Sequence, residues 1–298
     1  MVNGIVNVYK EKGFTSFDVV AKMRGIFHQK KIGHTGTLDP DAEGVLPVCL
    51  GKATKVCELL TDKDKIYETT MLLGVETDTQ DISGQIINSA DVKVDEIQIK
   101  NTINSFVGKI MQVPPMYSAL KINGQKLCDL ARKGITVERK AREIEIYSID
   151  ILDIKIPEIK MRVHCSKGTY IRTLCNDIGM KLGCYACMKE LLRTKVSVFS
   201  VNDALKLSEI EKAVFDNSYE FIYPIDFVFD TYPKVFAKEE ADNFIKNGNK
   251  LNKAMISNFE DTAFDSLVRL YTWDEVFVGI YKYIDSDEIF QPVKRFME

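Results

Sequence analysis

The sequence predicts an α+β fold: a mixed, largely antiparallel sheet with flanking helices, followed by a small β-rich C-terminal domain. Segments 144–156 and 159–165 alternate apolar and polar residues and are separated only by Pro157-Glu158, which predicts a hairpin. Helical and strand-like segments follow one another without the strict alternation of a doubly wound fold. A chain of 298 residues suffices for one large domain with a small appendage.

The N-terminal segment predicts a strand followed by a capped helix. Residues 5–8 form a short apolar run, which indicates a strand. Thr15 and Asp18 have the spacing of a capping box, in which each side chain accepts a hydrogen bond from the other's backbone N–H. Apolar residues then recur at helical spacing, namely Val19, Val20, Met23, Ile26 and Phe27.

The central region predicts further strands and helices in mixed order. Residues 66–75 alternate as a strand, and 95–107 are typical of a helix. One face of that strand carries Tyr67, Thr69, Met71 and Leu73. Residues 170–182 predict an amphipathic helix that ends at Gly183, and 191–201 predict another strand. The apolar stripe of this helix is Ile171, Leu174, Cys175 and Ile178.

A change in composition predicts two domains, residues 1–230 and 231–298. After Lys206 acidic residues outnumber basic ones, and Tyr-Pro pairs interrupt the chain at Tyr223 and Tyr232. Short strands are expected around 267–271 and 276–281. The C-terminal part is therefore predicted to be a small β-rich module.

The overall composition is typical of a soluble globular protein, with 45% hydrophobic and 28% charged residues. Charges interrupt the apolar runs, so neither a membrane span nor a secretion signal is expected. The seven cysteines are odd in number and scattered, and Cys184-x-x-Cys187 lacks a second pair at zinc spacing. We therefore expect free thiols, no metal site and a location in the reducing cytoplasm.

Basic residues are concentrated although the formal net charge is −3. Segment 109–142 has eight basic residues against Asp129 and Glu138. The eight are Lys109, Lys121, Lys126, Arg132, Lys133, Arg139, Lys140 and Arg142. A second basic cluster consists of Lys22, Arg24, Lys30 and Lys31. Such a segment is often only a solvated surface, but two of them on either side of a candidate catalytic loop favour a polyanionic substrate.

That candidate loop is segment 33–47, which contains Asp39 among glycines, threonines and prolines. Glycines permit sharp reversals, and Pro40 restricts the backbone directly after the carboxylate. An EF-hand calcium loop is disfavoured because Leu50 stands at its twelfth position, and no Gly-Lys-Ser/Thr follows for a phosphate loop. A structural turn and a catalytic loop both remain open from this segment alone.

Two other segments contain residues suited to catalysis or to binding a nucleic acid. Lys167 to Arg172 places an arginine just after the predicted strand end, where its fixed fork suits a carboxylate or a phosphate. Segment 113–134 combines a Pro-Pro bend, Tyr117 and spaced basic residues, which suits a protruding element that holds a nucleic-acid backbone. The alternative for the first segment is a packed tyrosine with a surface arginine. The alternative for the second segment is an ordinary basic hairpin.

Taken in order, these segments resemble the TruB-type tRNA pseudouridine synthases. The matching motifs are Gly-His-Thr-Gly-x-Leu-Asp-Pro at 33–40, Lys-Ile-Tyr at 65–67, Thr-Asp-Thr-x-Asp at 77–81, Pro-x-Tyr-Ser-Ala-Leu-Lys at 115–121 and Cys-Ser-Lys-Gly-Thr-Tyr-Ile-Arg at 165–172. Asp-Ile-Gly at 177–179 and Leu191 with Arg193 complete the set. The resemblance implies a pseudouridine-synthase fold, a thumb insertion at about 109–142 and a PUA-like C-terminal domain.

The resemblance also implies a reaction and its residues. The family isomerises the T-loop uridine at position 55 of tRNA after flipping the base out of the loop. It implies that Asp39 is the catalytic carboxylate, Arg172 its partner and Tyr67 the active-site tyrosine. It does not decide whether Asp39 attacks C6 of the base or C1′ of the sugar. The substrate-binding residues it implies are His34, Tyr170, Leu191, Lys10, Lys121, Arg132, Arg142, Lys167 and Arg193.

By the same resemblance the enzyme needs no cofactor or metal, binds the T-arm of tRNA and acts as a monomer without an obligate protein partner. Three positions depart from the family: Glu11 follows Lys10 in place of proline, Cys128 replaces a common tyrosine, and Leu192 replaces a common arginine. Two rival functions remain open here, a non-catalytic tRNA-binding protein and an isomerase acting on another RNA uridine.

Overall fold

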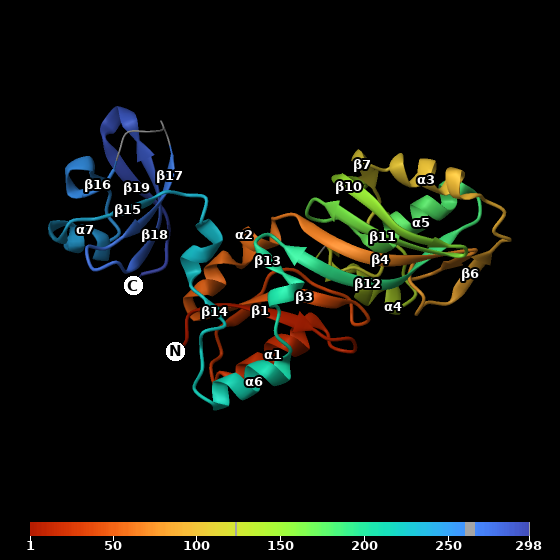
Figure 1. Cartoon of the computed structure of the whole chain (residues 1–298), viewed down its shortest axis with the longest axis horizontal. Helices are drawn as coiled ribbons and strands as arrows, with labels where there is room; N and C mark the ends of the chain where they lie inside the picture. The colour runs from red at the N-terminus through yellow and green to blue at the C-terminus, as the bar shows by residue number, and fades with distance from the viewer. Residues whose placement is uncertain (123, 260–265, 298) are drawn as a thin grey trace. The chain divides into compact units, whose positions relative to one another are not determined.

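The computed structural model describes residues 1–122, 124–259 and 266–297, which form two compact units (Figure 1). The larger unit comprises residues 7–48 and 57–219. The smaller unit comprises residues 220–298 with two short N-terminal segments, 1–6 and 49–56. The predicted division at residue 230 and the predicted thumb bounds stay predictions.

A mixed, largely antiparallel sheet forms the centre of the larger unit, and the predicted α+β class is confirmed. Its strands lie in the order β1 (Gly4–Lys10), β3 (Glu43–Leu50), β12 (Ala186–Val196), β4 (Lys65–Leu73), β11 (Glu158–Cys165), β10 (Arg142–Lys155) and β7 (Gly108–Gln112). The β12–β3 pair is parallel, whereas β12–β4, β4–β11, β11–β10 and β10–β7 are antiparallel. Short strands β2 (Ile32–His34) and β13 (Phe199–Ser200) pair with β3 and β12.

The helices of the larger unit follow the predicted signals. Helix α1 (Ser16–Ile26) begins at the predicted capping box of Thr15 and Asp18. Helix α5 (Ile171–Leu182) packs on β12 and β4 and ends at Gly183, whose φ of +74° is left-handed. Helix α3 (Glu96–Asn104) packs on α5 and β10 (Figure 1). The shorter or more peripheral helices are α2 (Cys57–Thr61), α4 (Leu127–Arg132) and α6 (Leu207–Phe215).

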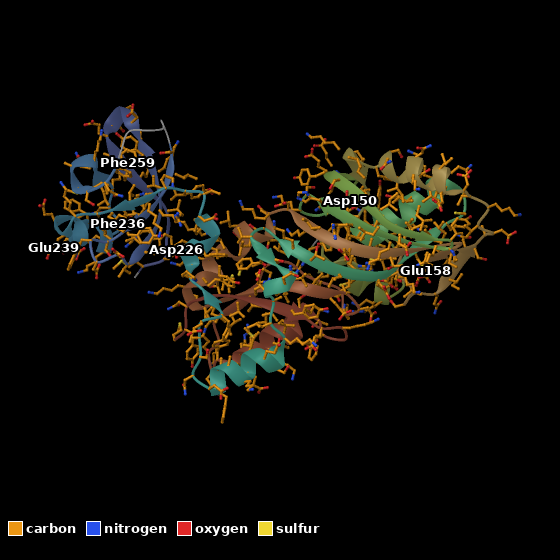
Figure 2. All side chains as sticks on the ribbon, viewed as in Figure 1. Asp150, Glu158, Asp226, Phe236, Glu239 and Phe259 are labelled. Carbon is orange, nitrogen blue, oxygen red and sulfur yellow. The ribbon has the colours of Figure 1, made fainter. Side chains whose placement is uncertain are left out.

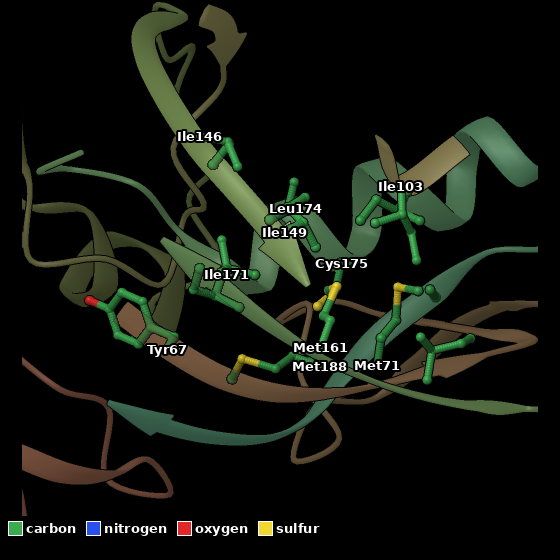
Figure 3. Packing of buried hydrophobic residues seen from close by; sticks show 14 of the residues in the cluster. Tyr67, Met71, Ile103, Ile146, Ile149, Met161, Ile171, Leu174, Cys175 and Met188 are labelled. Carbon is green, nitrogen blue, oxygen red and sulfur yellow. The ribbon is translucent and has the colours of Figure 1, made fainter. Parts of the chain in front are cut away.

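The core of the larger unit lies between the sheet and α5 (Figure 3). Alternate residues of β4 are buried, including Tyr67 and Met71, as the strand pattern predicted. They pack in one cluster with Ile146 of β10 and with Leu174 and Cys175 of α5. The predicted stripe of α5 is buried along its whole length, so this helix is fixed firmly against the sheet.

One predicted strand differs clearly from the structure in its bounds, whereas the predicted hairpin does not. The hairpin of β10 and β11 is confirmed, with Lys155 opposite Glu158. The strand predicted at 191–201 instead begins at Ala186 and ends at Val196, where Ser197 has a φ of +52° and reverses the chain. The bound was wrong because β12 lacks a clean alternation: it is bordered by neighbours on both sides and bulges against β4.

Segment 109–142 leaves the sheet and returns to it. Its first residues belong to edge strand β7, and Arg142 begins β10. Between them lie the small hairpin of β8 (Lys121–Ile122) and β9 (Gln125–Lys126) and then helix α4. A second small hairpin, β5 (Val75–Thr77) with β6 (Ile86–Ser89), follows β4 and was not predicted.

The smaller unit is β-rich, as predicted. Its sheet has the order β15 (Lys234–Phe236), β17 (Leu267–Tyr271), β18 (Phe277–Ile284), β19 (Ile289–Arg295) and β16 (Leu251–Asn252). Helix α7 (Asp242–Lys246) accompanies this sheet, and β14 (Ile222–Tyr223) pairs with the start of β1. Phe259, labelled in Figure 2, packs against Tyr283 and Phe290 at ring-centroid distances of 4.5 and 4.9 Å.

Candidate active site

The segment that carries Asp39 is a shaped loop between β2 and β3. Hydrogen bonds fix it from two sides: the Thr35 N–H donates to the Pro47 carbonyl at 3.1 Å, and the Leu38 N–H donates to Ser16 Oγ at 2.9 Å. Ser16 is the first residue of α1, so the capped helix start is tied directly to the residue before Asp39. The catalytic candidate is therefore presented on a rigid support.

Asp39 forms a two-pronged ion pair with Arg172. Arg172 Nε lies 3.1 Å from Asp39 Oδ2, and an Nη donates to Asp39 Oδ1 at 3.1 Å. The other Nη lies 3.3 Å from Asp81 Oδ2 and donates to the Thr79 carbonyl at 3.0 Å. A further bond of 2.7 Å reaches the Tyr117 carbonyl. Four hydrogen bonds from the two Nη atoms and the close Nε contact together fix both the guanidinium and the carboxylate.

The ionisation of Asp39 reflects a balance of burial and charge. Partial removal from water is the largest influence and raises the pKa of Asp39, and Arg172 opposes this by favouring the charged form. The Asp39 side chain remains 39% exposed whereas that of Arg172 is 6% exposed. A carboxylate held by a buried cation yet open to a ligand is suited to act as a nucleophile or to stabilise a cation.

Tyr67 lies on β4 at the edge of the same site. It is 9% exposed, and burial raises the pKa of its phenol. On the neighbouring strand its cross-strand partner is Arg193, whose positive charge acts on the Tyr67 phenol and favours its ionised form. The phenol is therefore neutral at ordinary pH and is held by a cation.

Lys10 is fully buried beneath the Asp39 loop. Its ammonium donates to the carbonyls of Ala42 at 2.6 Å, Pro40 at 3.1 Å and Glu11 at 3.3 Å. Burial lowers the pKa of Lys10 to about 8, against the opposing influence of Asp39. In this conformation Lys10 has no surface for direct contact with RNA and instead holds the loop backbone.

Two adjoining cavities meet at Asp39. The first, of about 320 Å³, is lined by Asp39, Tyr67, Tyr170, Arg172, Leu191 and Arg193, all of which sequence analysis singled out. The second, of about 610 Å³, shares Asp39, Arg172 and Leu191 and adds His34. Volumes of this size are typical of small-ligand sites. Burial lowers the pKa of His34, whose Nδ1 is buried without a hydrogen-bond partner.

The other predicted RNA-binding residues lie outside this centre. Lys121, Arg132, Arg142 and Lys167 are exposed. Arg132 borders the second cavity, and Lys121 and Arg142 border a separate cavity of about 270 Å³. Lys167 forms an ion pair of 2.9 Å with Asp62. Of the predicted site residues, some therefore line the cavity at Asp39 and others form an exposed basic set around it.

Sequence reasoning did not assign a role to Asp81, which joins Asp39 and Tyr117 around Arg172. The feature of the sequence that could have identified Asp81 is its position in the Thr-Asp-Thr-x-Asp motif that follows β4.

Within the described residues no group of three or more His, Cys, Asp or Glu side chains is arranged to hold a metal ion. In the same residues no helix is both long and apolar enough to cross a membrane.

Comparisons with known proteins give one consistent result. Residues 24–171 match the N-terminal domain of TruB family pseudouridylate synthases, and residues 172–230 match the C-terminal domain of tRNA pseudouridylate synthase B. The tRNA pseudouridine synthase B of Lachnoclostridium phytofermentans is 50% identical over 307 residues, which cover 99% of this chain and 100% of the relative. That of Clostridium kluyveri is 44% identical over 296 residues, with coverages of 99% and 100%.

Solved structures agree with these relatives. The crystal structure of a Cbf5-Nop10-Gar1 complex matches with a TM-score of 0.73 and 29% identity, over 99% of this chain and 85% of the other. The structure of an H/ACA RNP bound to a substrate RNA containing 2'-deoxyuridine matches with a TM-score of 0.72 and 27% identity. This match covers 99% of this chain and 85% of the other.

Proposed function

Because the chain belongs to the TruB family of pseudouridylate synthases, we propose that it isomerises the T-loop uridine at position 55 of tRNA to pseudouridine. The family predicted from the sequence motifs is thereby confirmed. The observation that carries the proposal is the Asp39–Arg172 pair, held at the junction of two cavities.

The reaction breaks the N1–C1′ bond and joins C1′ to C5 of the same base. Asp39 supplies the carboxylate, which acts as a nucleophile or stabilises a glycosyl cation. Arg172 favours the ionised form of Asp39 and orients it, because one carboxylate oxygen accepts an N–H from the guanidinium and the other lies 3.1 Å from its Nε. A uridine folded into the T-loop cannot reach a carboxylate inside a cavity, so the base must be flipped out.

The remaining residues divide between the base and the backbone of the RNA. Tyr67, Tyr170 and Leu191 line the first cavity and would enclose the flipped uracil. Tyr67 would also carry a proton between positions of the base, since its phenol is buried and neutral. His34 lies in the adjoining cavity, where it would occupy the space that the base has left.

The exposed basic residues would hold the T-arm through its phosphates. Lys121, Arg132, Arg142 and Lys167 present their charges to solvent, which suits contacts that release counterions. We further propose that the enzyme acts as a monomer on tRNA in the cytoplasm, without an obligate protein partner.

The proposal is tested by tritium release from a T-arm stem-loop labelled at C5 of uridine. Formation of the new C1′–C5 bond expels this label, so release measures isomerisation directly. We expect release from the parent T-arm and no pseudouridine in a T-arm whose target uridine is replaced by cytidine. Binding without release would favour a non-catalytic RNA-binding protein, and modification at another position would favour a different target uridine.

A further inference from the structure

We infer that Arg193 is a positioning residue that fixes the Tyr67 phenol relative to the Asp39 loop, and that it does not bind the RNA backbone. This inference rests on the proposed isomerase function. It replaces the substrate-binding role that family resemblance implied for Arg193, because the side chain is buried and its guanidinium is bonded to carbonyls of the Asp39 loop.

The strand order puts Arg193 between the two catalytic elements. Its strand β12 lies between β4, which carries Tyr67, and β3, which begins just after the Asp39 loop. Arg193 is directly opposite Tyr67 on β4 and opposite Gly44 on β3. A Cβ on Gly44 would lie only 2.3 Å from the Arg193 carbonyl, so glycine is required for the strands to approach this closely.

The Arg193 guanidinium donates hydrogen bonds to the two sides of the Asp39 loop and also interacts with the Tyr67 phenol. Arg193 Nε donates to the Val45 carbonyl at 2.7 Å, and an Nη donates to the Gly36 carbonyl at 3.4 Å. These carbonyls come from opposite ends of the segment that carries Asp39. A third interaction is electrostatic: the guanidinium charge acts on the phenol of Tyr67, the cross-strand neighbour of Arg193. The Arg193 side chain thereby links the two ends of the Asp39 loop to the Tyr67 phenol.

Burial separates this role from RNA binding. Arg193 is 1% exposed, and it is the largest fully buried side chain in the described part of the chain. A guanidinium stays charged inside a protein and therefore needs acceptors, and the carbonyls of Val45 and Gly36 supply two of them. The exposed Arg132 and Arg142 are the opposite case, with their charges directed to solvent.

Loss of the Arg193 guanidinium would release the Tyr67 phenol and loosen the Asp39 loop at the same time. The charge of Arg193 also favours the ionised form of Tyr67, so its removal would raise the pKa of this phenol further. A proton carrier with a higher pKa and a variable position is a poorer catalyst, while the exposed RNA-binding surface is unchanged. The expected defect is therefore in the chemical step.

The test compares Arg193→Met and Arg193→Lys with the parent in T-arm affinity and in the rate of tritium release in a single turnover. For Arg193→Met we expect affinity within about threefold of the parent and a rate about 100-fold lower. Arg193→Lys should regain part of the rate, because an ammonium can reach one of the carbonyls. Arg162→Met is the matched control: Arg162 pairs with Glu68 on the exposed face of β11, and its loss should leave the rate unchanged.

A double-mutant cycle with Tyr67→Phe distinguishes positioning from general loss of structure. If Arg193 acts through the phenol, Arg193→Met should lower the rate less than about tenfold in the Tyr67→Phe background. Independent, multiplicative effects would overturn the inference, as would a weakened affinity with a normal rate at saturating T-arm. If Arg193→Met does not fold, Arg193→Lys serves in the same cycle. Absence of release from the parent would instead refute the proposed function itself.

Discussion

Replacing Arg172 with lysine should destabilise the protein and slow isomerisation while keeping the charge. Arg172 donates four hydrogen bonds, to Asp39, Asp81 and the carbonyls of Thr79 and Tyr117, and its Nε lies 3.1 Å from the second oxygen of Asp39. A lysine ammonium has three donors on one atom and cannot span these partners. It would leave buried acceptors unpaired, each at about 1 kcal/mol or more. Because Arg172 is 6% exposed, we expect a total loss of about 3 kcal/mol in the free energy of unfolding.

Urea unfolding followed by far-UV circular dichroism measures this loss, and tritium release from the T-arm measures the rate. We expect the rate of tritium release to fall about 100-fold, since the Asp39 carboxylate loses one of its two contacts with the guanidinium. Arg162→Lys is the matched control, because Arg162 pairs with Glu68 at 2.8 Å but is 46% exposed. It should cost at most about 0.5 kcal/mol. Equal losses in the two variants would refute the reasoning.

Three further predictions concern the loop, the pH dependence and the thumb segment. Gly44→Ala should cost at least about 2 kcal/mol, since its φ is +104° and a Cβ would strike the Arg193 carbonyl. Gly13→Ala, at φ +89° with open space around it, is the control for backbone strain alone, and equal melting temperatures would contradict the steric argument. Because its pKa is raised above 3.8, Asp39 should take up a proton at a higher pH than a free aspartate, and kcat/KM should fall with decreasing pH at a midpoint above 3.8. A midpoint at or below that value in the pH–rate profile would count against this assignment. Arg132→Ala with Lys133→Ala should weaken T-arm binding and reduce the slope of log affinity against log salt by up to about 1.8. The same change at Lys93 and Lys100, which pair with Asp91 and Glu96 elsewhere on the surface, should leave that slope unaltered.

The sequence predicted those elements whose local pattern agrees with their environment. The alternation of β4 matched its buried face, and the capping box of Thr15 and Asp18 located the start of α1. The bounds of β12 failed because neighbours on both sides override any simple alternation. Its correct position matters, since this strand carries both Leu191 and Arg193.

The sequence named candidate site residues, whose roles stay predictions, but it did not show their geometry. Asp39, Tyr67 and Arg172 line one cavity, as the ordered motifs implied. Nothing in a single sequence shows that Lys10 and Arg193 are buried, because a lysine or arginine in a strand is usually on the surface. Their burial follows from contacts with carbonyls of the Asp39 loop, which exist only once distant strands have paired.

The most direct test of the account is the single-turnover release of tritium from the T-arm by Asp39→Asn, measured beside its affinity for the same RNA. Asparagine keeps the shape of the side chain but removes its charge and nucleophilicity. The account predicts that release is abolished while binding stays largely intact. Turnover retained in Asp39→Asn would contradict the central claim that this carboxylate carries the reaction.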